Sequence, residues 1–156
     1  MILKSPAELA ESLKTGERLL GLDLGEKTIG VAISDVMRMI ATPLITLARS
    51  KFTLDAEALL AIIDKNGVGG LVIGLPLNMN GTEGPSVQSA RAFARNFETK
   101  RSIPMLFWDE RLSTAAVTRT LLEADMSRAK RKEVVDKMAA SFILQGVLDA
   151  MNRRAV

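Results

Sequence analysis

The sequence of 156 residues contains no cysteine and no histidine. The absence of cysteine excludes disulfide bonds, zinc–thiolate sites and thiol nucleophiles. The absence of histidine excludes imidazole metal ligands and the most common general base. Any catalytic site in this chain must therefore be built from carboxylates, hydroxyl groups, lysine or arginine.

Long apolar runs are absent as well. No segment approaches the roughly 20 apolar residues that a membrane-spanning helix requires. Residues 1–14 carry acidic side chains where a signal peptide would have an unbroken apolar core. We therefore expect a cytoplasmic protein, whose formal net charge of +3 weakly favours polyanionic partners.

The chain has no repeat, low-complexity tract or linker, so we expect a single domain over residues 1–156. Residues 1–17 are expected to form a helical extension at its N-terminus. Ser5 and Glu8 form a capping-box pattern around Pro6, and this pattern predicts a short helix that begins at the proline.

Alternating or unbroken apolar residues predict five strands. Three should form an antiparallel meander in which Gly25–Lys27 is the first hairpin. Pro43 places the third strand at an edge, because proline cannot donate a ladder hydrogen bond. The other two are uniformly apolar, as expected for parallel strands buried on both faces. In chain order, the predicted strands are Arg18–Leu24, Thr28–Ser34, Ala41–Ala48, Leu71–Leu75 and Ile103–Trp108.

Helices are predicted where apolar residues recur at intervals of three and four. The first begins at Thr53, is about a dozen residues long and is stopped by Asn66–Gly67. The others cover Val87 to Phe97, a segment capped by Ser113 that carries Val117, Leu121 and Ala124, and about Glu133 to Asn152. The order of elements predicts an α/β fold of the RNase H-like class. Its five-stranded mixed sheet combines the antiparallel three-strand meander with two parallel strands and is flanked by helices.

Asp23 is the first candidate for catalysis. It lies inside a strand so apolar that a carboxylate there is costly unless it is paired or bound to a metal. Gly25 beside it would let a phosphate or a metal approach the backbone. The alternative is a structural role, in which Asp23 caps the turn at Gly25–Lys27.

Two further acids, Asp109 and Glu110, follow the last strand, at the edge where open α/β sheets gather their ligands. Adjacent residues point to opposite faces, so we expect Glu110 to face the site and keep Asp109 in reserve. The alternative is a solvated acidic pair with Arg111 as its counter-ion.

Asp136 falls on the border of the apolar stripe of the last helix rather than on its exposed face. An acid at that position needs a partner. The alternative is an aspartate stabilised by the helix dipole in the first turn, or paired with Lys132 or Arg131.

Together, Asp23, Glu110 and Asp136 offer carboxylate oxygens from two strands and a helix, with Asp109 as a fourth candidate ligand. Mg²⁺ or Mn²⁺ suits such ligands better than zinc does. Two such ions about 4 Å apart activate a water and stabilise the leaving oxygen in phosphodiester hydrolysis, with no need for histidine or cysteine.

Four segments match a known family, in order and at its usual spacing. The chain resembles the RuvX/YqgF family from Arg18 to Asn152. Members are described as Holliday-junction resolvases or as nucleases implicated in maturing the 5′ end of pre-16S ribosomal RNA. The matching segments are LLGLDLGEKTIGVAISD (Leu19–Asp35), VIGLPLNMNGTEGP (Val72–Pro85), FWDERLSTAAV (Phe107–Val117) and VVDKMAASFILQ (Val134–Gln145).

The resemblance implies an RNase H-like nuclease whose acidic positions fall on Asp23, Glu110 and Asp136. It implies structured nucleic acid as the partner, either pre-16S rRNA or branched DNA. Ribosomal assembly intermediates are further candidate partners, and the sequence leaves both a monomer and a homodimer open. The chain departs from typical RNase H-fold nucleases at Gly74–Leu77, which stands where an acid usually ends the fourth strand. Glu110 must therefore reach in from the strand beyond.

Basic residues near these acids are candidates for phosphate contacts. Lys27 and Arg111 lie beside the acids in sequence, and residues 128–132 form a basic run between the last two predicted helices. Such charges neutralise phosphates and make affinity fall with salt, whereas the alternative is a solvated loop. The predicted nucleic-acid-binding residues are Lys27, Arg111, Arg128, Lys130, Arg131 and Lys132.

Two other functions fit parts of the pattern. Leu22–Gly25 also resembles the phosphate loop of sugar kinases and chaperone ATPases, but those proteins need a second copy of the fold and no second such block is present. A non-catalytic RNA-binding module of ribosome assembly would keep the fold. Retention of all three acids argues against this module, and Asp23→Asn would discriminate between the two.

Overall fold

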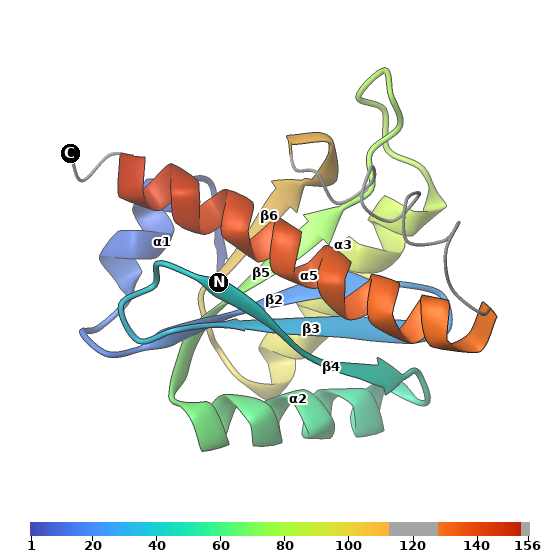
Figure 1. Cartoon of the computed structure of the whole chain (residues 1–156), viewed down its shortest axis with the longest axis horizontal. Coiled ribbons are helices and arrows are strands. Elements are labelled where there is room, and N and C mark those ends of the chain that lie inside the picture. Colours follow the sequence, from blue (N-terminus) through green and yellow to red (C-terminus); the bar gives the residue numbers. More distant parts are fainter. Residues whose placement is uncertain (113–127, 154–156) are drawn as a thin grey trace.

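The computed structural model describes residues 1–112 and 128–153, the first six of the second range by backbone alone (Figure 1). The predicted helix after Ser113 lies outside the described residues. In chain order, the elements are β1 (Ile2–Leu3), α1 (Pro6–Ser12), β2 (Arg18–Leu24), β3 (Thr28–Ser34), β4 (Ala41–Ala48), α2 (Phe52–Asn66), β5 (Val68–Leu75), α3 (Pro85–Lys100), β6 (Met105–Asp109), the 3-10 helix η1 (Glu110–Leu112) and α5 (Arg128–Arg153).

The described strands form one mixed sheet in the order β1-β6-β5-β2-β3-β4. The meander β2-β3-β4 is antiparallel, and β2, β5, β6 and β1 run parallel to one another. The predicted α/β arrangement is confirmed, but the sheet has six strands rather than five. Ile2–Leu3 is too short to show an alternating pattern, and it pairs with β6 at Met105 and Leu106. The N-terminal segment therefore completes the sheet.

The strand β4 lies at one edge of the described sheet, as Pro43 predicts. Pro43 lies opposite Ala32, and the next paired residue of β4 is Ile45, opposite Val31. Leu44 is thus left without a partner in β3. Such a bulge next to a proline is a common feature of edge strands, because it interrupts the row of backbone donors.

Helices cover both faces of the sheet, with α5 and α1 on one side and α2 and α3 on the other (Figure 1). Side chains of β2 alternate between two cores. Leu20 and Leu22 join the core under α2 and α3, and Leu19 joins the core under α5. Each such burial stabilises the fold by about 1.5–3 kcal/mol. Because the alternation continues along the strand, Asp23 shares the α5 face with Leu19.

Local sequence explains where the described helices begin and end. The Ser5 hydroxyl accepts the Glu8 N–H at 3.2 Å, so the predicted cap of α1 is present. Gly67 ends α2 in the left-handed conformation, with φ at 64°. In the described part of the chain, no helix is long and apolar enough to cross a membrane.

The last helix begins earlier than predicted, at Arg128 instead of about Glu133. The basic run at residues 128–132 is therefore the first part of α5, not a loop between helices. Alanine, lysine and arginine are good helix formers, but they carry no apolar stripe, so the periodicity of this segment did not mark it as helical.

Candidate active site

Asp23 lies near the end of β2, on the α5 face of the sheet, and is 9% exposed. Its partner in β3 is Gly30. On the other side, Leu22 pairs with Ile73 of β5, so the next residue, Gly74, lies level with Asp23. Both neighbours of Asp23 in the sheet are glycines, and they leave room above the sheet for side chains from other elements.

Asp136 comes from α5 and lies over β3. A Cβ atom on Gly30 would be 2.0 Å from the Asp136 carbonyl oxygen, so the helix backbone rests directly on this glycine. Thr28 lies two residues earlier on the same face, and its hydroxyl donates a hydrogen bond to Asp136 Oδ2. Asp136 is half-buried. An acid at the border of the apolar stripe was expected to need a partner, and the Thr28 hydroxyl is such a hydrogen-bond donor.

Glu110 follows β6 and is turned inward, with 8% of its surface exposed. A Cβ atom on Gly74 would lie 3.1 Å from Glu110 Cγ and 2.6 Å from Ile143 Cδ1. The Glu110 side chain therefore reaches over β5 on the α5 face. Gly74 explains how an acid from the next strand can take the place of the missing acid at the end of β5.

These placements bring Asp23, Glu110 and Asp136 to one region at the carboxyl ends of β2 and β6. Among the described side chains of residues 1–112 and 134–153, however, no three acidic groups converge closely enough to hold a metal ion in their present conformations. The structure therefore brings the backbone positions of these acids together, but not their carboxylate groups.

Asp109 has a different environment from Glu110. Arg111 Nη2 donates to Asp109 Oδ2 at 2.7 Å, and Arg111 Nε donates to the same oxygen at 3.0 Å. Arg111 Nη1 also donates to the Met79 carbonyl oxygen at 3.2 Å. The predicted alternative of an acid with Arg111 as its counter-ion therefore describes Asp109. Arg111 itself ties η1 to the loop that projects between β5 and α3 (Figure 1).

The side-chain hydrogen bond from Arg111 holds the pKa of Asp109 below its ordinary value of 3.8. Since this pKa is lowered on folding, the pair stabilises the fold fully above pH 3.8, and the contribution is lost as the pH falls through the lowered pKa.

We expect Arg111→Gln to return the Asp109 pKa to its ordinary range. A carboxyl ¹³C NMR titration of both proteins measures this, and an Asp109 pKa near 3.8 in the wild type would contradict it.

The other predicted phosphate contacts are only partly described. Lys27 is exposed in the turn between β2 and β3, beside the candidate acids. The backbone of residues 128–132 lies in the first turns of α5, a few residues before Asp136. The side chains of Arg128, Lys130, Arg131 and Lys132 lie outside the described part of the structure, as does any pairing of Asp136 with Arg131 or Lys132.

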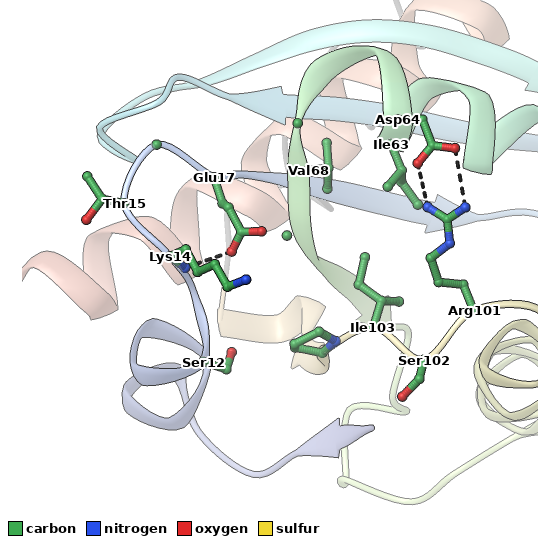
Figure 2. A pocket seen from close by; sticks show the side chains of 14 residues that line it. Ser12, Lys14, Thr15, Glu17, Ile63, Asp64, Val68, Arg101, Ser102 and Ile103 are labelled. Carbon is green, nitrogen blue, oxygen red and sulfur yellow. Dashed lines mark hydrogen bonds and ion pairs between the residues drawn. The ribbon is translucent and has the colours of Figure 1, made fainter.

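A separate cavity of about 570 Å³ lies at the amino ends of β2, β5 and β6 (Figure 2). Arg101 and Asp64 form an ion pair on one side, and Lys14 and Glu17 lie on the other (Figure 2). Ligands of open α/β sheets gather at the carboxyl ends of the strands. The candidate acids lie at that opposite end, so this cavity does not belong to their site.

Three residues that shape the site did not emerge from the sequence: Thr28, Gly30 and Gly74. A glycine inside a strand often marks a close backbone approach, and this signal could have singled out both glycines. Nothing local marks Thr28, because its partner Asp136 lies 108 residues away in the chain.

Comparison with known proteins shows close relatives of this chain. The chain is 65% identical over 149 residues to a protein of Paramagnetospirillum magneticum, covering 96% of both chains. It is 58% identical to a Rhodospirillum rubrum protein, covering 93% of this chain and 91% of the relative. Both carry the name "Putative pre-16S rRNA nuclease".

Among solved structures, the chain resembles Thermus thermophilus RuvC in complex with a Holliday junction substrate, with a TM-score of 0.52 and 10% identity. The match covers 89% of this chain and 96% of RuvC. At such low identity, the structural likeness shows a shared fold and nothing more. This fold agrees with the RNase H-like arrangement predicted from the sequence. The family model described as "RuvX: Holliday junction resolvase" matches residues 17–150. This chain belongs to the RuvX family.

Proposed function

We propose that this chain is a nuclease that hydrolyses phosphodiester bonds in pre-16S ribosomal RNA during ribosome biogenesis. The observation that carries the proposal is the placement of Asp23 between Gly30 and Gly74, with Asp136 over the first glycine and Glu110 over the second. The name shared by relatives up to 65% identical supports RNA as the substrate. The description of the family model supports a second candidate, a four-way DNA junction.

The acids are suited to a hard divalent cation, Mg²⁺ or Mn²⁺, and we propose two ions in the active state. Asp23 and Glu110 are buried carboxylates, and carboxylate oxygens are the ligands that hard divalent cations prefer. Asp23, Glu110 and Asp136 would hold the cations once the side chains of Asp23 and Glu110 rotate toward Asp136. Bound there, the cations would supply an activated water and stabilise charge on the leaving oxygen.

The remaining residues of the site would bind and orient the nucleic acid. Lys27 is exposed next to the acids and would contact a backbone phosphate, as would the basic residues at the start of α5. Asp109 is already paired with Arg111, so we assign it to holding the loop rather than to the reacting phosphate.

The test uses two labelled substrates, a precursor 16S RNA 5′ fragment and a four-way DNA junction, incubated with Mg²⁺, Mn²⁺ or EDTA. We expect cleavage of the RNA that requires metal and stops with EDTA. Preferential cutting of the junction, together with a stable homodimer in sedimentation, would favour the second candidate, because resolution needs two sites related by a two-fold axis. Tight, salt-sensitive binding without cleavage of either would contradict a nuclease.

Glu110 and Asp109 should differ sharply in their effect on cleavage. We expect Glu110→Gln to lower kcat at least about a hundredfold, since a metal ligand contributes several kcal/mol to the transition state. Asp109→Asn should cost less than about tenfold, because Asp109 acts through the exposed Arg111 pair. Single-turnover cleavage of both variants measures this, and the reverse order would mean that Asp109 is the metal ligand.

A further inference from the structure

Thr28 is the first residue of β3 and bonds to two parts of the candidate site at once. Its backbone carbonyl accepts the Gly25 N–H at 2.9 Å and closes the turn that follows Asp23 and Leu24. Its hydroxyl donates to Asp136 Oδ2. Thr28 therefore joins the end of the strand that carries Asp23 to the helix residue Asp136.

The strand β3 fixes Asp136 at two points. At Gly30, the absence of a side chain lets the α5 backbone rest on the strand, and this sets the position of the Asp136 main chain. At Thr28, the hydroxyl holds one oxygen of the Asp136 carboxylate, and this sets the rotation of the side chain. Among the described residues, no hydrogen bond to the second oxygen, Oδ1, accompanies this one.

We propose that Thr28 is a positioning residue: its hydroxyl holds the Asp136 carboxylate in one orientation and so prepares it to bind the divalent cation. The proposal rests on the proposed function. A carboxylate that is held in place before the metal arrives loses less rotational freedom on binding. Partners that orient a metal ligand typically change metal affinity or activity by about 10–100-fold.

Threonine suits this role because of its shape. Two heavy atoms on Cβ restrict its χ1 angle, so the hydroxyl points in a defined direction. Serine keeps the hydroxyl with more rotational freedom. Valine keeps the shape and loses the donor. Comparing threonine, serine and valine at position 28 therefore separates the effect of the hydrogen bond from the effect of side-chain packing.

The experiment compares Thr28→Val and Thr28→Ser with the wild type. The Kd of Mn²⁺ is measured without substrate by electron paramagnetic resonance, and kcat, KM and the melting temperature are measured separately. We expect Thr28→Val to raise the Mn²⁺ Kd and lower kcat, each by about 10–100-fold, with a nearly unchanged KM for nucleic acid. Thr28→Ser should keep the Mn²⁺ Kd and kcat within about threefold of the wild type, because serine retains the hydroxyl.

A double-mutant cycle completes the test. In an Asp136→Asn background, Thr28→Val should have little further effect on Mn²⁺ affinity, because the two residues act as one unit. Wild-type Kd and kcat in Thr28→Val would overturn the proposal, as would a serine variant as impaired as the valine variant. If Thr28→Val fails to fold, the Mn²⁺ Kd of Thr28→Ser decides: near wild type supports the proposal, and more than about tenfold weaker overturns it.

The outcomes separate this proposal from the proposed function. A wild-type protein that neither binds Mn²⁺ nor cuts nucleic acid overturns both. A wild type that binds and cuts, with an unaffected Thr28→Val variant, overturns only the role of Thr28.

Discussion

Replacing Asp23 with asparagine is expected to lower metal-dependent cleavage at least about a hundredfold while the fold and most of the RNA affinity remain. Asparagine has the size of aspartate, so packing on the α5 face should persist. It lacks the negative charge that holds a divalent cation, and the loss of several kcal/mol of transition-state stabilisation corresponds to about 10²–10³ in kcat. Single-turnover cleavage and equilibrium RNA binding measure the two effects separately.

Asp64→Asn is the matched control for this prediction. Asp64 is exposed, pairs with Arg101 and lies beside the cavity at the opposite end of the sheet (Figure 2). Its replacement should leave cleavage unchanged. A variant at Asp23 that still cuts near the wild-type rate would contradict the assignment and favour an RNA-binding module that keeps the fold without the chemistry.

Replacing Gly30 with alanine should damage both stability and activity. The added Cβ would lie 2.0 Å from the Asp136 carbonyl oxygen, and because this neighbour is backbone, the helix itself must move. Overpacking of this kind costs about 1–3 kcal/mol of the free energy of unfolding, and a clash with backbone belongs at the upper end. A shift of about 1 Å in Asp136 should lower kcat roughly a hundredfold.

Urea unfolding and single-turnover cleavage test this prediction, with Gly84→Ala as the control. Gly84 is the N-cap residue of α3, has a negative φ of −102°, and a Cβ there would have no neighbour nearer than 3.8 Å. We expect the control to cost less than about 1 kcal/mol. Equal destabilisation by the two substitutions would show that the close approach of α5 to Gly30 is not tight.

The sheet was predictable from local patterns because each pattern reflects burial on one or both faces. Alternation in Thr28–Ser34 and the unbroken apolar run at Leu71–Leu75 both correspond to described strands. Pro43 marked the edge strand through its missing donor. The helical wheel marked Asp136 as a partly buried acid, and the structure describes it as half-buried.

The features that sequence patterns missed depend on contacts between distant segments. The strand Ile2–Leu3 is defined by its pairing with Met105 and Leu106, not by its own two residues. The roles of Gly30 and Gly74 depend on what crosses above them, which only the packing of α5 and the direction of Glu110 reveal. The choice between Asp109 and Glu110 followed from strand alternation, but the Arg111 bonds that distinguish their environments became visible only in three dimensions.

The central claim is that Asp23, Glu110 and Asp136 form one divalent-metal site, and Mn²⁺ binding in the absence of nucleic acid tests it most directly. Titration followed by electron paramagnetic resonance should show binding to the wild type and to Asp64→Asn. It should show binding weakened at least about tenfold in Asp23→Asn, Glu110→Gln and Asp136→Asn. Equal Mn²⁺ affinity in the wild type and these three variants, or no binding by any protein, would contradict the account.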